Sequence, residues 1–157
     1  MEIKIGQEAP DFTLFATDKK QVTLSEFKGN NVLLLFFPLA FTSVCTAELC
    51  SVRDSLKIYE ALNVKPLGIS VDSLFSLAKF KEQEQLNFPL LSDFNKEVSR
   101  AYGSIYEDWG FGMKGVSKRS AFIIDKQGFI QYSEVLENAS EQPDFNKIKG
   151  KLQELNK

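Results

Sequence analysis

The chain has 157 residues, enough for a globular domain with a sizeable core, and we expect a single domain over residues 1–157. Its net charge of −2 argues against a nucleic-acid-binding surface, which would be basic. Apolar stretches are too short for a membrane span, and charged residues interrupt the N-terminus where a signal peptide would be apolar. We therefore expect a cytoplasmic protein that binds neither nucleic acid nor membrane and keeps its thiols reduced at rest.

Strand and helix patterns alternate along the chain. In chain order, they predict a hairpin (12–17 and 21–24), a helical turn (25–29), a strand (32–37), a helix (43–62), a strand (65–72), a helix (73–85), a strand (88–93), a short helix (95–103), a hairpin (119–136) and a helix (144–157). The apolar run at 32–37 is too short for a buried helix, so it predicts a central strand covered on both faces.

This order of elements predicts an α/β fold. Strands that alternate with helices, followed by a hairpin and a last helix, favour a central mixed sheet with helices on both faces. The order is that of a thioredoxin-like fold with an additional N-terminal β-hairpin.

Cys45 is the first candidate for a reactive residue. It follows the C-terminal end of the strand at 32–37 and lies in the first turn of the next predicted helix. Ligands of open α/β sheets bind at the carboxyl ends of the strands. The free amides and partial positive charge of a helix N-terminus favour a thiolate, which is the nucleophile. Judged by position alone, an inert buried cysteine is the commoner alternative.

Two neighbours of Cys45 have both a structural and a chemical interpretation. Thr42 lies near the helix N-cap, where its hydroxyl could cap the helix or reach the sulfur and a reacting oxygen. Pro38 ends the strand, and it could also shield the sulfur from water. Two cysteines and no histidine cannot supply the four ligands of a structural zinc site, so no metal is expected. We also expect no cofactor.

Taken together, Pro38, Thr42 and Cys45 resemble the Pro-x-x-x-Thr-x-x-Cys motif of peroxiredoxins, which are thiol peroxidases. The resemblance covers most of the chain. The opening "GQEAPDFTL" is similar to the N-terminus of that family, and "FTSVCTAELC" resembles the site of its bacterioferritin-comigratory or Q-type group. The segment "SKRSAFIIDKQGFI" looks like the family's later strand pair, which begins with an arginine, here Arg119.

The resemblance implies that the Cys45 thiolate attacks the terminal oxygen of a hydroperoxide and becomes a sulfenic acid. It implies that Thr42 hydrogen-bonds the peroxide and that backbone amides around Val44 and Cys45 hold its oxygens. Arg119 would lie beside the sulfur and stabilise negative charge on the thiolate and on the leaving oxygen. Without the cysteine motif, Arg119 would be interpreted as half of a surface ion pair.

Glu48 and Cys50 follow Cys45 on the same predicted helix. Glu48 is one turn away and would orient an arginine, or it simply complements the helix dipole as a first-turn acid. The resemblance implies that Cys50 is the resolving thiol, which forms an intramolecular disulfide that thioredoxin or a similar thiol reductant reopens. In one-cysteine relatives an external thiol takes the place of the resolving cysteine. If that holds here, Cys50 is inert.

Two other functions on the same fold stay open at this point. A thiol–disulfide oxidoreductase would usually carry Cys-x-x-Cys, whereas four residues separate the cysteines here. A non-catalytic peroxide sensor would share the first oxidation and pass its disulfide to a partner. The aromatic segment at 107–118 is interpreted as a pocket lining, as a subunit interface or as a long loop that packs locally. The resembled family often forms dimers, so a homodimer is one expectation.

Overall fold

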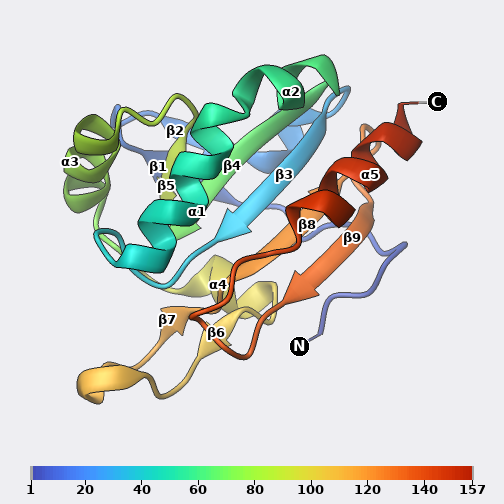
Figure 1. The fold of residues 1–157 in the computed structure, drawn as a ribbon. Coiled ribbons are helices and arrows are strands. Elements are labelled where there is room, and N and C mark those ends of the chain that lie inside the picture. The colour runs from blue at the N-terminus through green and yellow to red at the C-terminus, as the bar shows by residue number, and fades with distance from the viewer. Residues whose placement is uncertain (1, 157) are drawn as a thin grey trace.

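The computed structural model describes residues 2–156 and is built on a seven-stranded mixed sheet (Figure 1). The strands are β1 (Thr13–Ala16), β2 (Gln21–Thr23), β3 (Asn31–Phe36), β4 (Val64–Ser70), β5 (Leu90–Ser92), β8 (Ser120–Ile124) and β9 (Ile130–Val135). Their order across the sheet is β2-β1-β5-β4-β3-β8-β9. The pairs β3–β4 and β4–β5 are parallel and the other pairs are antiparallel. The predicted N-terminal hairpin therefore extends the sheet beyond β5.

Strand β3 lies in the interior of the sheet, between β4 and β8, and every residue in it is buried. Because side chains alternate along a strand, Leu33 and Leu35 enter one hydrophobic core while Leu34 and Phe36 enter the other. This confirms the prediction of a central strand covered on both faces.

Helices cover both faces of the sheet. They are α1 (Ser43–Asp54), α2 (Leu56–Ala61), α3 (Leu74–Glu84), α4 (Glu97–Ala101) and α5 (Phe145–Leu155), with 3-10 turns η1 (Leu24–Phe27) and η2 (Gly110–Gly112). Side chains of α1, α2, α3 and α5 share the core that contains Leu33, and Figure 1 shows α1, α2 and α5 over the same face. Residues of α4, η1 and the N-terminal segment fill the opposite core. Within residues 2–156, no helix combines the length and apolar character needed to cross a bilayer.

The prediction of one continuous helix over residues 43–62 is wrong. The helix ends at Asp54 and α2 begins at Leu56, because Ser55 has dihedral angles of φ −104° and ψ 10°. Its amide is shared between the carbonyls of Ser51 and Val52, so the last turn of α1 tightens. The apolar period continues across this break, which is why the sequence pattern did not reveal it.

A small antiparallel pair, β6 (Ile105–Tyr106) and β7 (Val116–Ser117), was not predicted. Each strand has two residues, which is too short for an alternating pattern to be visible. The aromatic segment at 107–118 spans the connection, and the pair projects away from the central sheet (Figure 1). Phe111 lies in η2 with an exposed side chain and a φ of +61°, a backbone region that bulky residues rarely adopt.

Candidate active site

The loop that leads from β3 into α1 is held by the neighbouring strand β4. The Phe37 amide donates to the Ile69 carbonyl at 3.0 Å, and the Ala40 amide donates to Asp72 Oδ2 at 2.8 Å. Pro38 is buried between these two attachment points. The loop therefore delivers the start of α1 to the carboxyl end of β3 in a defined position.

Thr42 is the N-cap of α1, but its side chain does not cap the helix. Its hydroxyl donates instead to the Leu39 carbonyl at 2.9 Å, while its own carbonyl accepts from the Thr46 amide at 2.9 Å. The first-turn amides, including those of Val44 and Cys45, thus donate no hydrogen bond to the cap side chain. This leaves the Thr42 oxygen lone pairs and the helix N-terminus available to a bound molecule.

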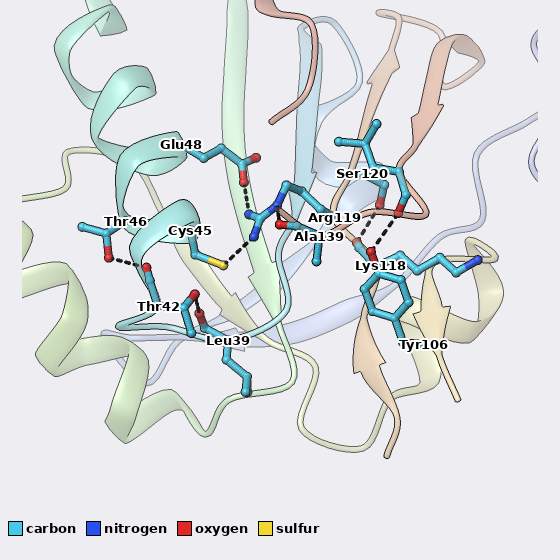
Figure 2. A network of polar contacts seen from close by, with 11 residues as sticks. Leu39, Thr42, Cys45, Thr46, Glu48, Tyr106, Lys118, Arg119, Ser120 and Ala139 are labelled. Carbon is cyan, nitrogen blue, oxygen red and sulfur yellow. Dashed lines mark hydrogen bonds and ion pairs between the residues drawn. The ribbon is translucent and has the colours of Figure 1, made fainter. Parts of the chain in front are cut away.

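Arg119, which immediately precedes β8, brings the site together (Figure 2). Its Nη2 donates to Cys45 Sγ at 3.2 Å, and its Nη1 donates to Glu48 Oε1 at 2.6 Å. Its Nε donates to the Ala139 carbonyl at 2.9 Å, in the loop that follows β9. Two contacts with α1 and one with the loop after β9 therefore fix the guanidinium plane against the sulfur.

The site is almost completely buried. Arg119 is 2% exposed, and both Cys45 and Glu48 are 0% exposed. Burial raises the pKa of Glu48 to about 7, and the charge and hydrogen bond of Arg119 only partly oppose this. Burial by itself would lower the pKa of Arg119. The charges and hydrogen bonds of Glu48 and Cys45 have a larger combined effect and raise that pKa, so Arg119 stays cationic. When Glu48 is neutral, it does not offset the positive charge of Arg119, which then stabilises the Cys45 thiolate more strongly.

Cys50 lies outside this cluster. Both cysteines are free, and Cys50 is half-buried with its Sγ 3.6 Å from Glu84 Oε2 on α3. Burial is the largest effect that raises the pKa of Cys50; Arg53 opposes it and Glu84 adds to it. The structure therefore brings Cys45 to Arg119 and Glu48, and it places Cys50 in a separate environment.

Sequence reasoning missed three groups around the two cysteines. Asp72 follows β4, and its place at the carboxyl end of a predicted strand next to the site was a usable signal. Ala139 acts through its main-chain carbonyl, for which no sequence signal exists. Glu84 is one of two acids in α3, and nothing in the sequence distinguishes it from Glu82.

Comparison with known proteins adds independent findings. Residues 5–133 match the AhpC/TSA family. The chain is 39% identical over 146 residues to a chloroplastic 2-cysteine peroxiredoxin of Chattonella marina var. antiqua, covering 86% of the chain and 72% of that protein. It is 40% identical over 136 residues to alkyl hydroperoxide reductase E of Mycobacterium bovis, covering 85% and 86% respectively. The crystal structure of peroxidoxin BcpB from Mycobacterium tuberculosis superposes with a TM-score of 0.87 at 28% identity, covering 98% of the chain and 99% of BcpB.

Proposed function

The chain belongs to the AhpC/TSA family of peroxiredoxins and is a thiol peroxidase, and we propose that Cys45 is the sulfur that peroxide oxidises. One observation supports this above all others. Arg119 Nη2 lies 3.2 Å from Cys45 Sγ at the start of a helix, so two sources of positive charge meet at one sulfur. Cys50 lies beside a carboxylate instead.

The proposed reaction begins with attack of the Cys45 thiolate on the terminal oxygen of hydrogen peroxide or an organic hydroperoxide. The S–O bond forms as the O–O bond breaks, and the leaving oxygen takes a proton to become water or an alcohol. Arg119 stabilises negative charge first on the sulfur and then on the leaving oxygen. The Thr42 hydroxyl already donates its hydrogen to the Leu39 carbonyl, so Oγ1 accepts a hydrogen bond from the hydroperoxide.

The remaining site residues position these groups. Glu48 and the Ala139 carbonyl hold the guanidinium in the plane from which it reaches the sulfur. The amides near Val44 and Cys45 bind the peroxide oxygens, and buried Pro38 keeps water from the sulfur.

After oxidation, we propose that Cys50 attacks the Cys45 sulfenic acid and forms an intramolecular disulfide, which thioredoxin or a similar thiol reductant reduces. The Cys-x-x-x-x-Cys spacing, which fits that of the Q-type group, supports this step. We also propose that the protein is cytoplasmic, forms one domain over residues 1–157 and works as a homodimer, whose mass sedimentation equilibrium would measure.

Stopped-flow oxidation with hydrogen peroxide and with an organic hydroperoxide, followed by intact mass, tests the cysteine assignments. Cys45→Ser should lose peroxide reactivity, whereas Cys50→Ser should still consume about one equivalent, because the first step needs one thiolate. Peroxide reduction by Cys45→Ser at the parent rate would contradict the assignment. Parallel assays of insulin-disulfide reduction and of turnover with thioredoxin separate the peroxidase from an oxidoreductase or a sensor.

A further inference from the structure

The second half of α1 is attached to the C-terminal end of α3. Cys50 Sγ donates to Glu84 Oε2 at 3.6 Å. Arg53 Nη1 donates to the Glu84 main-chain carbonyl at 2.6 Å, and Asn87 Nδ2 donates to the Arg53 carbonyl at 3.2 Å. The first turn of α1 has no such attachment to α3; its contact is with Arg119, through Cys45. The two cysteines are therefore held by different parts of the molecule.

The surroundings of Cys50 favour the neutral thiol. Burial raises the pKa of Cys50 most, Arg53 opposes it, and Glu84 raises it through both its charge and the hydrogen bond, with a smaller contribution from Asp54. A thiol is a much weaker nucleophile than a thiolate. While α1 stays packed against α3, these surroundings therefore lower the fraction of Cys50 that is thiolate.

We propose that Glu84 is a positioning residue for the resolving step, which holds Cys50 as a neutral thiol while α1 is folded and releases it when α1 unwinds. The inference rests on the proposed resolving role of Cys50. The folded helix keeps Cys45 next to Arg119 and keeps Cys50 inactive, and unwinding reverses both states. Glu84 thereby lengthens the life of the Cys45 sulfenic acid.

The step that Glu84 delays needs no further oxidant. Cys50 loses its proton to solvent, and its thiolate attacks the Cys45 sulfur. The S–S bond forms, the S–O bond of the sulfenic acid breaks, and the hydroxide leaves and takes up a proton as water. Cys50 supplies the electron pair of the new S–S bond, so the Cys50 sulfur is oxidised and the Cys45 sulfur is reduced.

Glu84→Gln tests the proposal because it removes the charge and keeps the size of the side chain. The Arg53 bond survives, since it goes to the main-chain carbonyl. Glu82→Gln is the matched control, because Glu82 is an exposed acid on the same helix. After one equivalent of hydrogen peroxide, we expect the disulfide to form about three- to tenfold faster in Glu84→Gln than in the parent at neutral pH. The two rates should converge at a pH where the thiol is ionised in both proteins.

Each other outcome overturns the proposal. An unchanged rate would make Glu84 a bystander, and a slower rate would make it a base that helps Cys50. An acceleration as large at high pH as at neutral pH would show that the variant merely loosens α1.

A second measurement separates this inference from the proposed function. In the Cys45→Ser background, Glu84→Gln should speed alkylation of Cys50 by iodoacetamide at neutral pH, whether or not Cys50 is the resolving cysteine. An unchanged alkylation rate would refute the proposal that Glu84 keeps Cys50 protonated. A parent protein that forms no Cys45–Cys50 disulfide would refute the resolving role and, with it, the delay that we assign to Glu84.

Discussion

Arg119 is the single residue that joins the segments of the candidate site. It contacts Cys45 and Glu48 on α1 and Ala139 after β9, although it lies 74 positions after Cys45 in the chain. A buried cation fixed in this way needs no reorganisation when negative charge develops on the leaving oxygen. The roles proposed for the other residues depend on this placement.

Arg119→Met should slow the oxidation of Cys45 by about 100- to 1,000-fold, the usual cost of removing one positioned electrostatic contact. The defect should persist at a pH where the thiol is fully ionised, because the guanidinium also stabilises the leaving oxygen. Stopped-flow oxidation across a pH series measures this. Complete recovery at high pH would show that Arg119 affects only the ionisation of the sulfur.

The variant also leaves the Glu48 carboxylate buried without its partner, which is strongly destabilising. The measurement is therefore repeated with Arg119→Met and Glu48→Gln combined, and with Glu48→Gln alone as the control. A double variant that oxidises as fast as Glu48→Gln alone would remove Arg119 from the reaction.

At the scale of elements, α1 decides whether the two cysteines can meet. Five residues along a helix give a rise of about 7.5 Å and a rotation of about 500°. A disulfide needs Cα atoms within about 7 Å and converging Cβ directions. The intact helix of the reduced protein meets neither condition, so the proposed disulfide requires α1 to unwind. Because its second half is attached to α3, the first turns are expected to open first, and Cys50 is freed when the unwinding reaches its contact with Glu84.

Hydrogen exchange on the reduced and disulfide forms tests this directly. Amides of residues 43–52 should lose protection in the disulfide form, whereas those of β3 should keep it, because β3 is a fully buried strand in the interior of the sheet. Mass spectrometry confirms the disulfide in the same sample. Equal protection of residues 43–52 in both forms would rule out the unwinding model.

At the scale of the whole molecule, the buried site affects the free energy of unfolding. The pKa of Glu48 is raised from 4.5 to about 7 by burial, so between these values the folded state binds a proton that the unfolded chain releases. This contribution to stability is complete at low pH and is lost as the pH rises through about 7. Each pKa unit corresponds to about 1.4 kcal/mol, which allows a total of a few kcal/mol.

Glu48→Gln should abolish this pH dependence, because glutamine stays neutral. The free energy of unfolding of the parent minus that of the variant should therefore decrease between pH 5 and pH 8, as measured by urea denaturation of the reduced proteins. Glu60→Gln, on the exposed surface of α2, serves as the control. A difference that is constant or grows with pH would contradict the assignment.

Local sequence determined much of the fold. The apolar run that became β3, the strands and helices around it and the start of α1 at Ser43 were all predicted, and the likeness to BcpB confirms the thioredoxin-like peroxiredoxin fold. Periodicity and turn residues act over short windows of chain, so they report where an element lies and which side is apolar. The position of Cys45 at a strand end and a helix start belongs to this level.

Only the tertiary structure decided which groups meet. The break at Ser55, the β6–β7 pair and the contact of Arg119 with the Ala139 carbonyl could not be calculated from local pattern. The same holds for Glu84, an ordinary helix acid until α3 packs beside Cys50. Distances between segments far apart in the chain depend on how two cores pack against one sheet, and burial then sets the charge of each group that they enclose.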